Sequence, residues 1–194
     1  MALPLDQAMM APARTWRMVA PAAEDCFALL KQPACGLLEH CRQLATNPEA
    51  FWLPHFGFQA MALTRDWIAR EPALLAIETI CPIAQLGILR MPDHWAYQWH
   101  RDENRLACIN MLLSSDHHSH TLFGQSINST NMHCRELAYE PGRYYLFNNQ
   151  IPHTVINLDV ERHLFSLEFA EAVPYGELRQ SLASAGLLVP AESE

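Results

Sequence analysis

The segment HTVINLDVERHLFSLEF, residues 153–169, decides the fold, because two short runs rich in β-branched and aromatic residues flank a turn around Asp159. We predict strands over His153–Leu158 and Arg162–Phe169. Six further runs of the same kind precede them: Ile83–Arg90, Ala96–His100, Leu106–Ser114, His120–Gln125, Arg135–Glu140 and Arg143–Asn148. Short strands at this close spacing predict a closed or double-sheet antiparallel architecture, which we interpret as a jelly roll.

The last of these strands separates its side chains into two groups. Arg162, Leu164, Ser166 and Glu168 point to one side, because alternate residues of a strand share a face. The opposite side carries His163, Phe165, Leu167 and Phe169 and is mostly apolar. We therefore predict that the apolar face packs against a helical layer and that Arg162 faces a central cavity.

The N-terminal part has a helical character. Residues 34–44 and 66–80 are predicted helices, with Pro72 opening the latter part of the second as a first-turn proline does. Phe51-Trp52 and 56–58 are candidate edge strands, and a last helix is predicted over Tyr175–Ala185 with Gly186 as its stop. The fold class is thus mainly β with N-terminal helices. We expect a single domain over 1–194, made of an irregular arm and helical layer (1–81), a jelly-roll catalytic core (82–170) and a C-terminal helix and tail (171–194).

Composition limits the partners. The chain has 13 basic and 21 acidic residues and a net charge of −8, which argues against a nucleic-acid partner. Lys31 is the only lysine, so lysine-nucleophile chemistry in the C-terminal half is excluded. The six cysteines form no C-x-x-C pair, and we interpret them as small buried hydrophobic residues. Without a signal peptide or a membrane-length apolar run, we expect a soluble, cytoplasmic protein with no membrane partner.

A sparse polar set carries the chemistry. His100 and Asp102 are two residues apart and can reach one metal from the same strand end, while His153 must arrive from a distant strand. Two histidines and one carboxylate can bind one face of a metal and leave the other face open, as in non-haem Fe(II) oxygenases. The alternative is that these are unrelated polar residues at strand ends.

Arg162, nine residues beyond His153, adds an anion site. An arginine inside a β-sandwich is costly unless it is paired, and a carboxylate bound by the guanidinium would offset that cost. The sequence therefore predicts a metal together with an anionic co-substrate. The alternative is a surface ion pair of Arg162 with Asp159 or Glu161.

The quoted residues carry a family resemblance. Trp99-His100-Arg101-Asp102, Cys108-Ile109-Asn110, the stretch 142–148, His153-Thr154-Val155-Ile156-Asn157 and Arg162 together resemble the aspartyl/asparaginyl β-hydroxylases, which are 2-oxoglutarate-dependent oxygenases built on a double-stranded β-helix. The likeness covers roughly residues 82–170. It implies Fe(II) held by His100, Asp102 and His153, the distal carboxylate of 2-oxoglutarate held by Arg162, and a second co-substrate contact at Asn110. Dioxygen would be the second oxidising substrate.

The resemblance leaves the substrate open. Some peptide-hydroxylating members lack the carboxylate ligand, whereas this chain keeps Asp102, as do bacterial members that act on free amino acids. We expect hydroxylation of an amino acid or of an Asp/Asn-type residue in a peptide or protein, with the oligomeric state undecided. The alternatives are a cupin-like metal enzyme that does not use 2-oxoglutarate and a non-catalytic metal-binding sensing module. The histidine-rich segment 116–120 is interpreted as a solvated hairpin loop.

Overall fold

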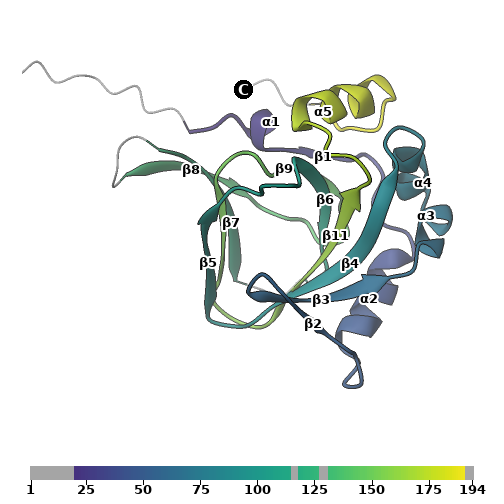
Figure 1. Cartoon of the computed structure of the whole chain (residues 1–194), viewed down its shortest axis with the longest axis vertical. Coiled ribbons are helices and arrows are strands. Elements are labelled where there is room, and N and C mark those ends of the chain that lie inside the picture. Colours follow the sequence, from purple (N-terminus) through teal and green to yellow (C-terminus); the bar gives the residue numbers. More distant parts are fainter. Residues whose placement is uncertain (1–19, 115–117, 127–130, 191–194) are drawn as a thin grey trace, which may run out of the picture.

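Two antiparallel sheets form the body of the protein. The computed structural model describes residues 20–114, 118–126 and 131–190. The larger sheet has the strand order β1-β9-β6-β11-β4-β3-β2, and the smaller sheet has the order β5-β10-β7-β8. The two sheets face each other, with three of the helices outside the larger one (Figure 1). This arrangement confirms the predicted jelly-roll, double-stranded β-helix architecture.

The strands have the following bounds: β1 (Phe27–Leu29), β2 (Leu53–His55), β3 (Phe58–Leu63), β4 (Ile83–Met91), β5 (Trp95–His100), β6 (Ala107–Leu112), β7 (Ser119–Ser126), β8 (Met132–Leu137), β9 (Tyr145–Asn148), β10 (His153–Asn157) and β11 (Arg162–Phe169). Each of the eight predicted strands is present. β11 has the predicted ends, and most of the others differ by a few residues at one end or both.

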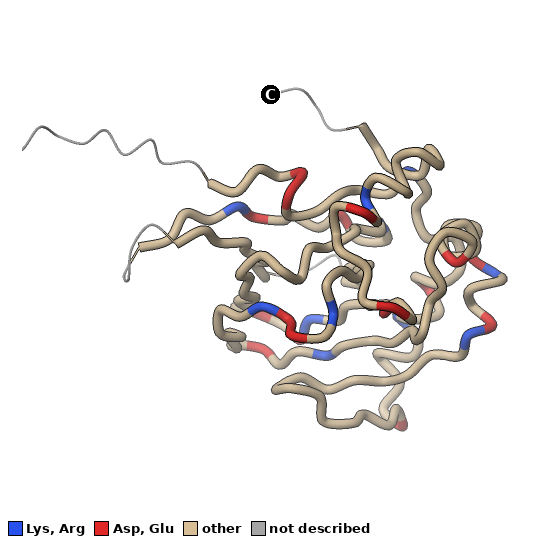
Figure 2. The backbone as a smooth tube through the Cα atoms, turned by 45° about the horizontal axis from the view of Figure 1, so that its top comes forward, with Lys and Arg blue, Asp and Glu red and all other residues tan. Residues whose placement is uncertain are grey.

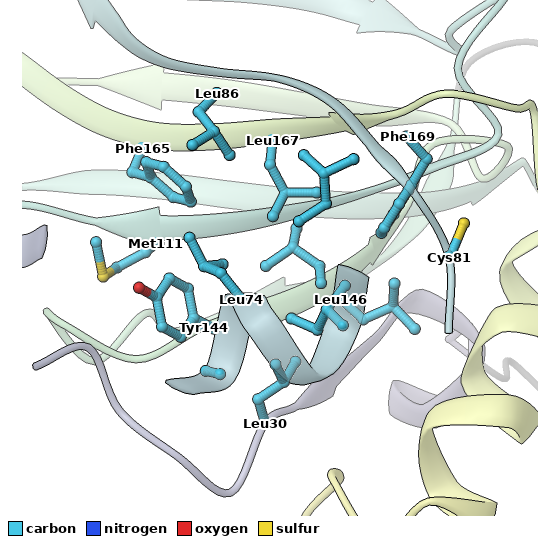
Figure 3. Close-up of a cluster of buried hydrophobic side chains, with 14 of the residues drawn as sticks. Leu30, Leu74, Cys81, Leu86, Met111, Tyr144, Leu146, Phe165, Leu167 and Phe169 are labelled. Atoms are coloured by element: carbon cyan, nitrogen blue, oxygen red, sulfur yellow. The ribbon is translucent and has the colours of Figure 1, made fainter. Parts of the chain in front are cut away.

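β11 has the two faces that its sequence predicts. Phe165, Leu167 and Phe169 belong to the main hydrophobic cluster, together with Leu74 of the helical layer (Figure 3). On the other face, Arg162, Leu164 and Ser166 are also buried, but between the two sheets. Burial of the first face against the helices adds apolar contact that helps to hold the layers together.

The helical layer consists of α2 (Leu37–Ala45), α3 (Asp66–Arg70) and α4 (Pro72–Glu78), while α1 (Ala23–Cys26) and α5 (Tyr175–Ser184) lie near the two ends of the chain. The helix predicted over 66–80 is divided at Glu71, which has an extended backbone, and Pro72 then opens α4 in its first turn. Proline disfavours helical geometry in the residue before it, which explains the break. α5 ends near Gly186, whose positive φ of 73° confirms the predicted stop.

Glu71 connects the helices across the break. Its carboxylate is fully buried and accepts hydrogen bonds from the backbone N–H groups of Cys35, Gly36 and Leu37 at 2.9, 2.7 and 2.6 Å. These N–H groups lie at the start of α2, where a helix has no internal partners for its donors. A negative charge there is also favoured by the helix dipole. One side chain from the α3–α4 junction thus caps α2.

The N-terminal region differs from expectation in its strands. β1 was not predicted, and it pairs with β9 at the edge of the larger sheet. The candidate edge strands at 51–52 and 56–58 are shifted to β2 and β3, and β3 extends to Leu63 and pairs with β4. Pro54 in β2 is tolerated because that strand is the outermost one. Of the predicted arm, residues 1–19 lie outside the described part.

The surface and the cysteines complete the fold. Acidic and basic residues are interspersed over the molecule (Figure 2). Cys26, Cys41, Cys81 and Cys108 are buried, but the interpretation was wrong for Cys35 and Cys134, which are exposed because they lie in a loop and on the outermost strand of the smaller sheet. Within the described ranges, no helix is long and apolar enough to cross a membrane.

Glu71→Ala should lower the free energy of unfolding by about 3 kcal/mol, since it leaves three N–H groups of α2 without their charged acceptor. Urea denaturation followed by circular dichroism measures this. Glu39→Ala, on the exposed side of α2, is the matched control and should change stability by less than about 0.5 kcal/mol. Equal effects for the two variants would contradict the capping role.

Candidate metal centre

Three side chains converge where two strands of the smaller sheet meet. β5 ends at His100 and β10 begins at His153, and these two residues are register partners. Asp102 follows two residues after β5, and its backbone N–H donates to the carbonyl oxygen of Asn149 at 3.1 Å. Asp102 Oδ1 lies 3.5 Å from His100 Nε2 and 3.8 Å from His153 Nε2. One ligand atom from each residue lies within 4.8 Å of the others, which suits a single metal ion.

Both histidines present the same ring nitrogen to the site. His100 Nδ1 donates to the carbonyl oxygen of Gln98 and His153 Nδ1 donates to that of Ile151, each at 2.9 Å. Because a carbonyl oxygen only accepts, these contacts keep the proton on Nδ1 and leave the Nε2 lone pairs free. Such a contact on the far nitrogen is the usual way in which a protein orients a metal-binding histidine.

Asp102 is oriented by neighbours on its other oxygen. Oδ2 accepts from Arg105 Nε at 2.9 Å and from the side-chain amide of Asn149, which leaves Oδ1 turned toward the histidines. Burial alone would raise the pKa of the Asp102 carboxyl, but contacts with His100 and Arg105 outweigh it and hold the pKa well below its usual range. The carboxylate is therefore ionised and offers one oxygen to a cation.

The two imidazoles differ in protonation. Burial lowers the pKa of His153 to about 4, so this ring is neutral near pH 7. Burial acts in the same direction on His100, but the Asp102 carboxylate and the Gln98 carbonyl outweigh it, and the pKa of His100 is raised. A bound cation would displace the remaining proton, because only the neutral imidazole is a ligand.

Arg162 lies between the sheets without a counter-charge. Its side chain is buried, with the residue only 4% exposed, and Nη2 donates to Thr121 Oγ1 at 3.1 Å while the guanidinium lies 5.6 Å from the centre of the Tyr139 ring. In the described part of the chain no carboxylate forms an ion pair with it, and neither Arg162 Nε nor the Tyr139 hydroxyl meets a hydrogen-bond partner. Burial lowers the pKa of Arg162 and raises that of Tyr139. The alternative reading, a surface ion pair of Arg162 with Asp159 or Glu161, does not hold, because the side chain is buried and forms no ion pair with either residue.

One cavity joins the histidines to this arginine. It is lined by His100, His153, Arg105 and Asn149 at the candidate metal centre, by Arg162, Thr121, Tyr139 and Asn110 at the other end, and by apolar side chains between them. Asn110 is nearly buried and accepts from Cys108 Sγ at 3.5 Å. The cavity therefore brings together His100, His153, Arg162 and Asn110, and Asp102 lies beside it against the two histidines, although the roles of these residues stay predictions.

Sequence reasoning missed four contributors. None of Asn149, Arg105, Thr121 and Tyr139 was assigned a role from the sequence. Asn149, Thr121 and Tyr139 contact residues far from them in the chain, so no local pattern marks them. Arg105 is only three residues from its partner Asp102, and that spacing is the signal that could have found it. In the histidine-rich segment, His118 lies 3.3 Å from Asp159 and His120 lies 2.7 Å from Glu136, while residues 116 and 117 lie outside the described part. Across the described ranges, His100, Asp102 and His153 are the one group with metal-ligand geometry.

Comparison with known proteins identifies the fold. No family model matches the chain, and no curated protein matches its sequence. A prolyl-4-hydroxylase from Pseudomonas putida is similar in structure, with 15% identity and a TM-score of 0.52 over 70% of this chain and 84% of that one. A 2OG-Fe(II) oxygenase family protein from Burkholderia pseudomallei has 14% identity and a TM-score of 0.49 over 68% and 76%. The non-heme alpha-ketoglutarate-dependent epimerase SnoN from nogalamycin biosynthesis has 12% identity and a TM-score of 0.49 over 72% and 75%. The likeness to the prolyl-4-hydroxylase shows a shared double-stranded β-helix fold, and the narrower resemblance to aspartyl/asparaginyl β-hydroxylases stays a prediction.

His100→Ala and His153→Ala should each abolish Fe(II) binding while the fold stays near native, because each removes one of three ligands. Anaerobic calorimetric titration with Fe(II) measures this. His120→Ala, a histidine on the same sheet that pairs with Glu136, should bind Fe(II) as the unaltered protein does. Normal titrations in both ligand variants would remove the site assignment.

Asn149→Ala should weaken Fe(II) affinity about tenfold, because Asp102 Oδ2 loses a donor that fixes the carboxylate. Gln150→Ala is the control, since the Gln150 side chain donates to the backbone carbonyl of Asp102, at 2.9 Å, and not to its carboxylate. If the two variants bind Fe(II) equally well, the Asn149 contact does not orient the ligand.

Proposed function

We propose that this chain is an Fe(II)- and 2-oxoglutarate-dependent dioxygenase that hydroxylates an amino acid or an Asp/Asn-type residue in a peptide or protein. Its fold is the one shared with the oxygenases described above. His100, Asp102 and His153 would hold Fe(II), and the donor set of two imidazoles and one carboxylate suits that ion.

The observation that carries this proposal is the burial of Arg162 in the cavity that His100 and His153 also line, with the Asp102 carboxylate next to both histidines. A desolvated guanidinium without a counter-charge is unfavourable, and a bound carboxylate offsets its cost. Thr121 and the Tyr139 hydroxyl lie beside it as further hydrogen-bonding groups, and Asn110 lines the same end. A dicarboxylate that reaches from Arg162 to the metal fits this distribution, and 2-oxoglutarate is such a molecule.

The protein's own residues orient the reactants. Arg162 would hold one end of 2-oxoglutarate, and Arg105 and Asn149 hold Asp102. Apolar side chains such as Leu164, Phe147 and Val155 line the cavity between its two ends and limit water there. Held by these residues, Fe(II) would supply the activation of dioxygen, and 2-oxoglutarate would serve as the reductant, giving succinate and carbon dioxide.

A cupin-like enzyme that does not use 2-oxoglutarate is the alternative. It would use the same metal ligands, but it offers no role for the buried Arg162. A non-catalytic sensing module would bind the metal without turnover. Formation of succinate from 2-oxoglutarate separates both from the proposal, since oxygenases of this kind show some uncoupled decarboxylation without substrate.

The decisive experiment is an anaerobic titration with Fe(II) and 2-oxoglutarate, followed through the weak visible metal-to-ligand charge-transfer band. The band should form only with both components. In Arg162→Met the affinity for 2-oxoglutarate should fall about 100-fold, the loss expected for a charge-assisted pair, while Fe(II) affinity is kept.

Arg90→Met is the matched control for that variant. Arg90 lies on the neighbouring strand β4, but its guanidinium bonds to Gln59 and packs on Trp52 outside the cavity. The charge-transfer band of Arg90→Met should match that of the unaltered protein. An undiminished band in Arg162→Met, or bound iron that never gives a band, would exclude the co-substrate role.

A further inference from the structure

A second cavity adjoins the first on the inner face of the larger sheet. Arg105 and Leu89 line both cavities, so the second one opens beside the candidate metal centre. The part of the second cavity that lies outside the first is formed by β2, β3, β4 and the second half of β11.

Small side chains form the floor of this second cavity. Ser166 of β11 pairs with Gly87 of β4, and Gly87 pairs with Ala62 of β3. Ala60 lies two residues from Ala62 and also lines the cavity. A row of residues without large side chains across three adjacent strands leaves room for a small molecule above the sheet.

Arg105 forms the positive end of the cavity. Its Nε is used by Asp102 and its Nη1 donates to Ser166 Oγ at 3.3 Å. The remaining Nη2 has no hydrogen bond to the part of the chain that the structure describes, and an arginine has donors to spare for a second carboxylate. An anion bound there would lie next to the metal ligand Asp102.

Glu168 forms the negative end. It lies two residues beyond Ser166 on the same face of β11, and its carboxylate accepts from the side-chain amide of Gln85. Within the described residues no basic side chain forms an ion pair with it, although it is half-buried. The carboxylate is thus placed to receive a cationic group.

We propose that this second cavity binds the substrate as a free zwitterionic amino acid, with its carboxylate on Arg105 and its ammonium group on Glu168. The proposal rests on the proposed function, because it takes the bound amino acid as the molecule that is hydroxylated. Ser166 and Glu168 are two residues apart, which is about 7 Å along a strand. Arg105 donates to Ser166, so its guanidinium and the Glu168 carboxylate start from neighbouring positions on one face of β11. A small amino acid with one hydrogen bond at each charged end can span a distance of this size. A residue within a peptide chain has neither free end and would leave both side chains unpaired.

The test is a binding measurement on the full chain, which is independent of turnover. Unlabelled L-amino acids, their carboxamides and their N-acetyl derivatives are screened by saturation-transfer NMR, first on the metal-free protein and then with Zn(II) and 2-oxoglutarate. Calorimetry then gives the affinity of each compound that binds. At least one free amino acid should bind, and blocking either of its ends should weaken binding tenfold or more, as loss of a charge-assisted hydrogen bond predicts.

Glu168→Gln tests the ammonium end without touching the metal ligands. It should weaken binding of the free amino acid about tenfold and leave the affinity of the N-acetyl derivative unchanged. Glu171→Gln removes the same charge just beyond β11 at an exposed position and should have no effect. Arg105 is left unaltered because it also orients Asp102, so the carboxamides test the carboxylate end.

The outcomes separate this proposal from the enzyme assignment. If the Fe(II)–2-oxoglutarate band forms but no free amino acid binds, or if blocked and free compounds bind alike, the zwitterion site is wrong and the oxygenase assignment is unaffected. If an amino acid binds with the predicted dependence on Glu168 but the band never forms, the cavity assignment stands and the oxygenase proposal fails. Equal binding of peptides with internal aspartate, unaltered in Glu168→Gln, would also overturn the zwitterion site.

Discussion

The antiparallel pairing of β5 with β10 is the contact on which the candidate metal centre depends. It places His153 opposite His100, although the two residues are far apart in the sequence. A slip of one residue in this register would turn one histidine to the other face of the sheet. β10 is held on its other side by β7, so the register is specified from both neighbours. The site is therefore a property of the smaller sheet as a whole.

The two faces of the larger sheet have different roles, one in stability and the other in binding. The face toward the helices is apolar and closely packed (Figure 3). Its one titrating group from β11 is His163, the second residue of the strand. The inner face carries Arg162, Ser166 and Glu168 in a row. Unpaired charge is tolerated there because the cost is offset by the burial on the opposite side of the same strand. Stability is thereby kept apart from the groups that face a ligand.

The alternation in β11 and the spacing of His100, Asp102, His153 and Arg162 were readable from the sequence because strands have a period of two and ligands follow strand ends. The helical layer was readable from Pro72 and the apolar periodicity, apart from the break at Glu71. Asn149, Thr121 and Tyr139 were not, because each acts on a residue that is distant in the chain. Arg105 was also missed, although its partner Asp102 is only three residues away. β1 was missed since three residues are too few for a period, and its pairing with β9 is what makes it a strand.

The cap that Glu71 places on α2 also affects how the protein fluctuates. Since one carboxylate from the α3–α4 junction satisfies the first N–H groups of α2, opening of either part exposes unpaired groups in the other. The three helices should therefore open as one cooperative unit, with similar protection of their amides in native-state hydrogen exchange. That unit covers the outer face of β11. The outer face of the strand that carries Arg162 should therefore become exposed only when all three helices open together.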